Sequence, residues 1–199
     1  NHISNLDLNY DRKVDYLRVI EVVENYTHVI ILQAVLDRDV FQDVATIEVE
    51  KDRYNNVQIQ VVGNPYFYGN NYIYEPVYVA RPVIYNVFWA SSYRPYYSNY
   101  YWNNYPSFYY AWTPYPVYRY RNNIHVHINV HNHYNYVNTR RSNHAVAMYS
   151  NRRSNGYERI YPNNSFTQRN TVSNRYELEN TRNSTQTTSR NSLTRNQSS

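Results

Sequence analysis

The chain has 199 residues, of which 27 are tyrosine, only 3 are glycine and none is cysteine. The length suits one domain with a tail or two small units, and the lack of cysteine excludes a disulfide framework and a thiolate zinc site. No run of 18 apolar residues occurs, which excludes a membrane-spanning helix, and the charge is divided between an acidic front of net −6 (residues 1–75) and a basic back of net +11 (residues 76–199).

The first element is the stretch LDLNYDRKVDY, residues 6–16. It places oxygen-bearing groups at alternate positions, in the order Asp7, Asn9, Asp11, the backbone carbonyl of Lys13, and Asp15. Ca²⁺ prefers about 6–8 hard oxygen ligands, which a tight loop supplies from alternate residues. The stretch therefore predicts a weak Ca²⁺ site, although Arg12 replaces the usual glycine at the sixth place and Arg18 replaces a closing glutamate. The alternative is a solvated Asp/Asn turn that needs no metal.

Four strands are predicted next, and their short connections favour an antiparallel meander. They are Tyr16–Glu24, His28–Leu36, Asp43–Glu50 and Asn56–Val62. The first two are rich in valine and isoleucine, and the last two alternate apolar with polar residues. Glu48 and Glu50 lie on the polar side of the third strand, where a solvated face is expected. A helix over residues 15–36 is the alternative, which the β-branched residues disfavour.

An aromatic and proline-rich region follows. Between Tyr66 and Tyr120, 23 of 55 residues are Tyr, Phe or Trp, and seven of the eight prolines lie between Pro65 and Pro116. Proline removes a ladder donor, so we expect an irregular wrap rather than central strands. The rings either cover the meander or contact a protein partner or a second copy of the chain. The candidate contact residues are Tyr96, Tyr97, Tyr100, Tyr101, Trp102, Phe108, Tyr109, Tyr110 and Trp112.

Residues 124–133 alternate aliphatic residues with histidine and asparagine, which predicts one further strand that bears histidines. Such a strand would hold four imidazoles on one face, and paired imidazoles are ligands of Zn²⁺ or Cu²⁺. The candidate ligands are His125, His127, His131 and His133. The alternative is a polar strand face exposed to solvent.

From about Asn138 onward the chain consists largely of Asn, Arg, Ser, Thr and Gln, which predicts an extended polar tail. Its arginines and two earlier ones are candidates for binding an acidic polysaccharide or another polyanion. These are Arg119, Arg121, Arg140, Arg141, Arg152 and Arg153. No nucleic-acid-binding motif occurs, which argues against a nucleic-acid partner. The sequence thus predicts a mainly β fold in three regions, at residues 1–63, 64–137 and 138–199.

The order of motifs from about Asn5 to Leu178 resembles an uncharacterised family of secreted proteins of Bacteroidota. The resemblance is carried by the LDLNYDRKVDY opening, the QDVATIEVE strand and the Tyr/Trp/Pro-rich middle. The opening itself is similar to the calcium loops of dockerins. The resemblance implies export to the periplasm or cell surface, and a first residue Asn1 in place of Met fits a mature product.

Motifs of known catalytic sites are lacking, because the sequence has no cysteine, no G-x-S-x-G, no H-E-x-x-H and no glycine-rich phosphate loop. We therefore expect no enzyme. The expected function is that of a secreted or cell-envelope structural or interaction protein that engages a protein partner or itself through the Tyr-rich region, with weak Ca²⁺ binding. A binding module for an acidic polysaccharide is the alternative.

Overall fold

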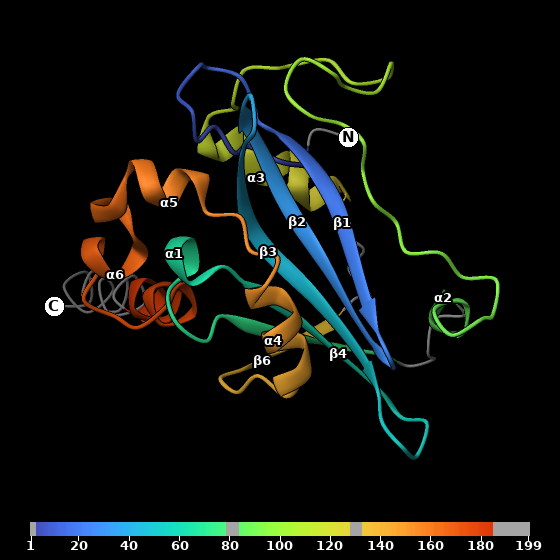
Figure 1. Ribbon diagram of the computed structural model, residues 1–199. Coiled ribbons are helices and arrows are strands. Elements are labelled where there is room, and N and C mark those ends of the chain that lie inside the picture. Colours follow the sequence, from blue (N-terminus) through green and yellow to red (C-terminus); the bar gives the residue numbers. More distant parts are fainter. Residues whose placement is uncertain (1–2, 79–83, 128–132, 185–199) are drawn as a thin grey trace, which may run out of the picture.

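The computed structural model describes residues 3–78, 84–127 and 133–184. Its centre is one antiparallel sheet whose six strands follow one another in chain order (Figure 1). The strands are β1 (Tyr16–Glu24), β2 (Thr27–Asp37), β3 (Val40–Lys51), β4 (Val57–Gly63), β5 (Ile73–Val77) and β6 (His133–Val137). The predicted mainly β fold is confirmed, and β1 has the bounds that the sequence predicts.

Tight turns join the first strands although the chain has few glycines. Glu24 pairs with Thr27, so that Asn25 and Tyr26 alone connect β1 to β2. Asn25 and Asp39 have the positive φ angles of 53° and 55° that such turns require. Asparagine and aspartate tolerate this left-handed conformation better than other residues with a side chain. The abundant Asn and Asp therefore take the place that glycine has in most hairpins.

The irregular aromatic region lies along the free edge of β1. Residues 88–116 form no helix or strand beyond isolated bridges. Glu21 donates its backbone N–H to the Tyr96 carbonyl at 2.7 Å, and Ser98 donates to the Val19 carbonyl at 3.0 Å. An uncovered edge strand is a template for unwanted pairing. The wrap therefore shields β1.

A proline occurs inside the sheet, in β5, where the sequence predicts an irregular conformation. β5 pairs with β4 only through Ile73 and Tyr74, and its remaining residues pair with β6 alone. Pro76 thus lies beyond the end of the β4 ladder, so its missing N–H costs no bond to β4.

The predicted extended tail is wrong for residues 143–184, which are largely helical and pack on the rest of the chain. The helical segments are α4 (Asn143–Ser150), α5 (Gly156–Ile160), η1 (Pro162–Asn164), α6 (Phe166–Arg169) and residues 175–184. Ala145 and Met148 of α4 are buried with Ile20, Val29 and Ile31 of the sheet, and Figure 1 shows α4 on the near side of the sheet. Residues 185–199 lie outside the described part.

Two properties of the tail allow it to fold. A few apolar anchors have helical spacing, such as Ala145 and Met148, and they complete the core. The polar residues supply helix caps, because the Ser142 hydroxyl accepts the Ala145 N–H at 2.9 Å. Residues 143–184 therefore form helices that pack on the sheet region, although their composition is typical of a disordered segment.

The other helices are short or polar. They are α1 (Pro65–Tyr68), α2 (Ile84–Val87) and α3 (Val117–His127). Tyr66 of α1 joins Leu8, Leu36 and Tyr157 in a second buried cluster. Within the described ranges no helix has the length and apolar character needed to cross a membrane.

Candidate functional site

In the loop of residues 7–15, two side chains accept hydrogen bonds from backbone N–H groups two residues further along the chain. The Asn9 side-chain oxygen accepts the Asp11 N–H at 3.1 Å, and the Asp11 carboxylate accepts the Lys13 N–H at 2.8 Å. Arg12, at the place of the usual glycine, has a φ angle of 66°. Arg12 therefore takes the left-handed conformation for which glycine is normally selected, at some conformational cost.

The carboxylates of this loop lie in one another's electric field. Asp15 is only 6% exposed, and it accepts the Leu8 N–H at 2.7 Å. Burial, together with the smaller effect of the negative charges of Asp7 and Asp11, raises the pKa of Asp15 to about 7, although the hydrogen bond from the Leu8 N–H opposes this shift. Oδ1 of Asp7 is buried and has no hydrogen-bond partner among the described residues. The loop thus holds more negative charge than its own contacts compensate.

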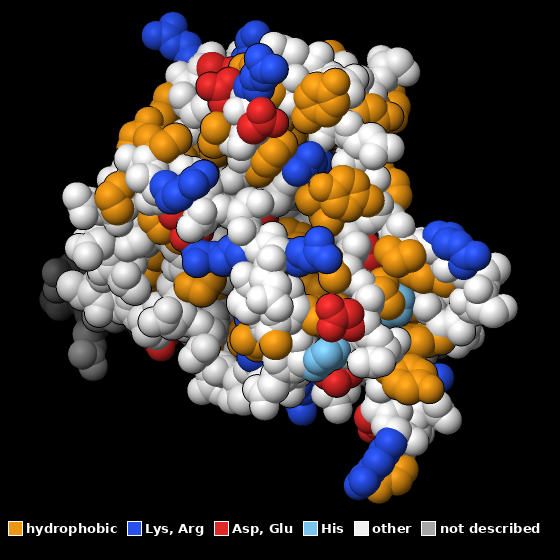
Figure 2. Space-filling model, viewed as in Figure 1, with side chains coloured by type: hydrophobic (Ala, Val, Ile, Leu, Met, Phe, Trp, Pro, Cys, Tyr) orange, Lys and Arg blue, Asp and Glu red, His pale blue; other side chains and the backbone are white. Residues whose placement is uncertain are grey.

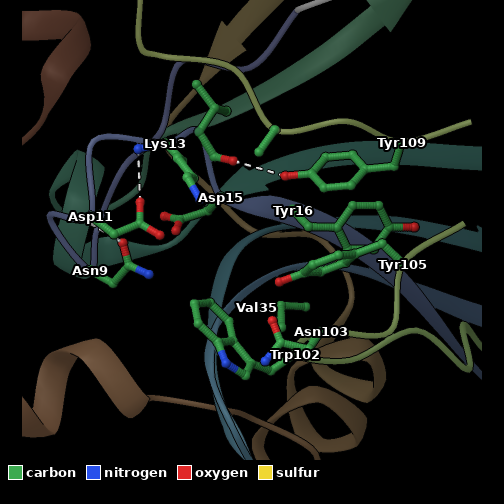
Figure 3. Close-up of a pocket in the computed structure, with 12 residues that line it drawn as sticks. Asn9, Asp11, Lys13, Asp15, Tyr16, Val35, Trp102, Asn103, Tyr105 and Tyr109 are labelled. Carbon is green, nitrogen blue, oxygen red and sulfur yellow. Dashed lines mark hydrogen bonds between the residues drawn. The ribbon is translucent and has the colours of Figure 1, made fainter.

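A pocket of about 130 Å³ separates this loop from the aromatic region. In Figure 3 the carboxylates of Asp11 and Asp15 point toward each other on one side, and tyrosine rings form the other side. The Tyr16 ring centroid lies 5.3 Å from that of Tyr105 and 5.0 Å from that of Tyr109. Tyr109 also donates its hydroxyl to the Val14 carbonyl at 3.1 Å. Two features predicted separately, the oxygen-rich loop and the aromatic region, therefore share one pocket.

The oxygen ligands at this pocket suit a hard cation such as Ca²⁺ better than Zn²⁺ or Cu²⁺, which imidazole groups commonly bind. Asp11, Asp15 and Asn9 line it. No cluster of three or more His, Asp or Glu side chains within metal-binding reach occurs in residues 3–78, 84–127 and 133–184. An ion would therefore need amide, backbone or water oxygens to complete its shell, which is consistent with weak affinity.

The predicted contact rings divide into two sets in the structure. We name residues 96–112 the aromatic segment. Its exposed rings are between 54% and 82% accessible, and they are Tyr96, Tyr97, Tyr101, Phe108 and Tyr110. Its partly buried rings are Tyr100, Trp102, Tyr105, Tyr109 and Trp112, of which Tyr105 was not among the predicted contact residues. The backbone of the segment is anchored as well, because Val14 donates its N–H to the Trp112 carbonyl at 2.8 Å. The segment therefore covers its own sheet with one set of rings and presents the other set to solvent.

The histidine-bearing strand is wrong over residues 124–127. His125 and His127 lie in the last turn of α3, and both are exposed. Residues two apart on a helix point to different faces, so this pair lacks the shared face of a strand. His133 begins β6 and is exposed, whereas His131 lies outside the described residues. Binding of Zn²⁺ or Cu²⁺ stays a prediction, but His125 and His127 do not share the strand face on which that prediction was based.

The predicted polyanion-binding arginines are not gathered in one patch. Three form ion pairs, namely Arg140 with Glu48, Arg141 with Glu75 and Arg153 with Glu158. On α3, Arg121 is exposed and the Arg119 guanidinium lies 4.4 Å from the Tyr115 ring centroid. Arg152 is exposed after α4. Glu48, expected on a solvated face, is buried instead because Arg140 reaches it from the C-terminal region.

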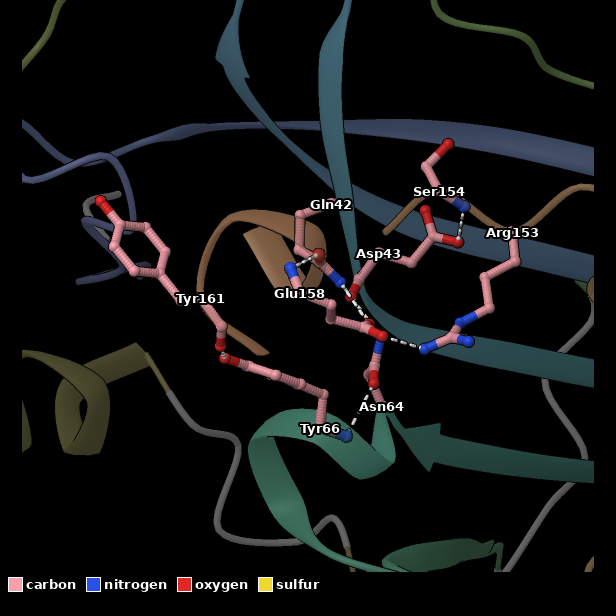
Figure 4. Close-up of polar contacts among 8 residues, drawn as sticks. All are labelled: Gln42, Asp43, Asn64, Tyr66, Arg153, Ser154, Glu158 and Tyr161. Carbon is pink, nitrogen blue, oxygen red and sulfur yellow. Dashed lines mark hydrogen bonds and ion pairs between the residues drawn. The ribbon is translucent and has the colours of Figure 1, made fainter. Parts of the chain in front are cut away.

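A buried polar network joins β3 to the C-terminal helices (Figure 4). Asp43 is fully buried and accepts the Ser154 N–H at 2.8 Å and the Gln33 side-chain amide at 2.7 Å. Gln42 donates to the Glu158 carboxylate at 2.8 Å. Burial raises the pKa of Asp43, opposed by these hydrogen bonds. A run of polar residues within a strand is the one signal of this network in the sequence, and it does not reveal the partners more than 100 positions away.

His28 and Glu21 form a second buried pair, which the sequence did not predict. Nδ1 of His28 lies 2.7 Å from Glu21 Oε1, and both side chains are almost inaccessible. The rings of Phe88, Trp89 and Tyr93 surround the imidazole with centroid distances of 4.8, 5.6 and 5.4 Å. Despite burial, hydrogen bonds from His28 and Tyr93 hold the pKa of Glu21 below its usual value. This pair ties the wrap to β1 and β2.

No family model, curated protein or solved structure matches the chain. The resemblance to secreted proteins of Bacteroidota therefore stays a prediction.

Proposed function

We propose that this chain is a non-enzymatic structural or interaction protein of the cell envelope or exterior. In this proposal the exposed rings of the aromatic segment engage protein surfaces, first of all a second copy of the chain, and the loop of residues 7–15 binds Ca²⁺ weakly. The observation that carries the proposal is the division of the segment into buried and exposed rings. Phe108 is 82% exposed on a backbone that is fastened at Val14 and along β1.

Anchoring matters because binding through a flexible segment loses free energy to ordering. Tyrosine adds ring area at modest entropic cost and can form hydrogen bonds at its hydroxyl, so it is common in adaptable interfaces. The exposed rings Tyr96, Tyr97, Tyr101, Phe108 and Tyr110 combine these two properties. Several exposed rings on an anchored backbone are typical of a surface that binds a partner.

The Ca²⁺ part of the proposal rests on charge. The negative charges of Asp7 and Asp11 disfavour the ionised form of Asp15, and a divalent cation beside Asp11 and Asp15 in the pocket would replace this repulsion by attraction. The cation would also stabilise the arrangement of the loop and Tyr109, which line the same pocket. Extracellular Ca²⁺ sites work at affinities of about 10⁻⁴–10⁻³ M, which suits an exported protein. Ca²⁺ would thereby stabilise the position of the aromatic segment.

Sedimentation velocity over a range of protein concentrations tests the proposal. Self-association should increase with Ca²⁺, decrease with a chelator, and persist at high ionic strength because it depends on ring burial rather than on charge. Phe108→Ser together with Tyr110→Ser should reduce it. Tyr54→Ser is the matched control, since Tyr54 is similarly exposed but lies in the β3–β4 turn. A wild-type chain that sediments as a monomer in every condition would contradict the proposal.

A further inference from the structure

A groove of about 500 Å³ lies between β1 and the loop that follows α4. Its walls include Arg18, Arg152, Arg153 and Tyr97, and its floor includes Ile20 and Val22. Figure 2 shows Lys and Arg side chains gathered around the middle of this face, above α4. The groove thus combines guanidinium groups with an aromatic ring and an aliphatic floor. Its volume suits a small ligand.

Arg18 is the unusual member of this wall. Its side chain is 9% exposed, and among the described residues it forms no ion pair. Nε donates to the Gln33 side-chain oxygen at 2.7 Å and Nη1 donates to the Tyr100 carbonyl at 3.1 Å, which leaves Nη2 without a hydrogen bond there. Burial lowers the pKa of Arg18 although the negative charge of Asp43 opposes this shift, and the Phe41 ring centroid lies 3.7 Å from the guanidinium carbon, so Arg18 is stabilised without a direct ion pair. An anionic ligand would supply the missing partner.

The other two arginines are held in place by buried bonds. Asp43 donates its backbone N–H to the Ser154 carbonyl at 2.9 Å and accepts the Ser154 N–H through its carboxylate at 2.8 Å. This double contact fixes the loop against β3. Arg153 pairs with Glu158, whereas the exposed Arg152 forms no ion pair in the described part of the chain. Arg152 is therefore available to a ligand.

One carboxylate also lines the groove, but its acceptor positions are occupied. Glu21 bonds His28 through Oε1 at 2.7 Å, and through Oε2 it accepts the Tyr93 hydroxyl at 2.5 Å and the Tyr96 N–H at 2.9 Å. Its side chain is 3% exposed. The charge accessible to a ligand in the groove is therefore mainly that of the guanidinium groups.

From these contacts we propose that the groove binds an acidic sugar, with its carboxylate on Arg18 and Arg152 and its ring on Tyr97. The carboxylate would accept a hydrogen bond from Nη2 of Arg18, whose other nitrogens are occupied, and charge-assisted hydrogen bonds from the exposed Arg152 guanidinium. The apolar face of a sugar ring packs on an aromatic ring, and Tyr97 is 58% exposed beside the groove. Ile20 and Val22 complete an apolar surface for the same ring. A uronate residue of a polysaccharide combines these two features.

Isothermal titration calorimetry of the intact chain with a short oligogalacturonate tests this site, with a neutral oligogalactan of equal length and inorganic phosphate as comparisons. We expect the oligogalacturonate to bind and its affinity to fall with ionic strength. Arg152→Gln should weaken binding about tenfold through the loss of one charged contact. Arg53→Gln, in the distant β3–β4 turn, should leave it unchanged. Arg18→Met should weaken binding as well.

Three results would overturn the site. They are equal binding of the neutral oligogalactan, phosphate binding as tight as that of the oligogalacturonate, and full affinity in Arg152→Gln. Arg152→Gln alone is decisive if Arg18→Met does not fold, because Arg152 is exposed. The titration is performed at concentrations at which the chain is monomeric, so its result does not depend on self-association.

Discussion

Replacing Asp15 by asparagine should stabilise the protein at neutral pH. The folded chain retains the Asp15 proton up to a pKa of about 7, whereas the unfolded chain releases it near 3.8. Between these values the folded state binds more protons, so the free energy of unfolding falls as the pH rises. The difference corresponds to about 4 kcal/mol above pH 7. The asparagine side chain cannot ionise, and its amide oxygen can still accept the Leu8 N–H.

Urea denaturation of both proteins in a chelator, from pH 4 to pH 8, measures this effect. The two should be about equally stable near pH 4, and Asp15→Asn should exceed the wild type by a margin that grows to about 4 kcal/mol. Asp11→Asn is the control, since Asp11 is exposed and adds only a weaker repulsion. The difference between variant and wild type removes the contribution of every other titrating group.

Ca²⁺ should then act on one protein and not on the other. A cation that binds ionised Asp15 stabilises the wild type at pH 8 by mass action, whereas Asp15→Asn lacks that ligand charge. The reasoning is refuted if Asp15→Asn is less stable than the wild type at pH 8. It is refuted as well if the difference between them does not change with pH.

Three further substitutions test the packing. Met148→Ala should lower the free energy of unfolding by about 2–5 kcal/mol, and Val146→Ala on the exposed side of α4 should change it little; equal effects would contradict the docking of this helix. Gly69→Ala should lower Tm, because Gly69 has a φ angle of 80° and a Cβ there would lie 2.2 Å from a backbone oxygen; an unchanged Tm would exclude this contact. Arg140→Met should cost about 3–5 kcal/mol in urea denaturation by leaving the buried Glu48 unpaired, and a loss below about 1 kcal/mol would contradict this.

Local patterns are sufficient to predict the meander and the loop conformation. β1 is specified by its own valines and isoleucine, and the turn of residues 7–15 by Asn9 and Asp11, whose partners lie two positions away. The burial of Asp15 could not be predicted in this way. It depends on Tyr109 and Trp112, which contact Val14 from about a hundred residues further along the chain.

The errors have the same origin. Alternation of His with Ile and Val around residue 125 fits a strand by period, but the run continues the helix that begins at Val117 after Pro116. Average composition predicts an extended tail, whereas the fold of this region depends on single anchors such as Met148 and on caps such as Ser142. Long-range partners decide these elements, and a single sequence does not reveal them.

The cover on β1 has a consequence for biosynthesis. Tyr96, which bonds Glu21, follows it by 75 positions in the chain. At about 5–20 residues per second, translation takes about 4–15 seconds to supply that cover. During this interval the first hairpin can already close, because its contacts are local. During this interval the edge of β1 can pair with other nascent chains on the same polysome. Synthesis of the region around Tyr96 ends this exposure.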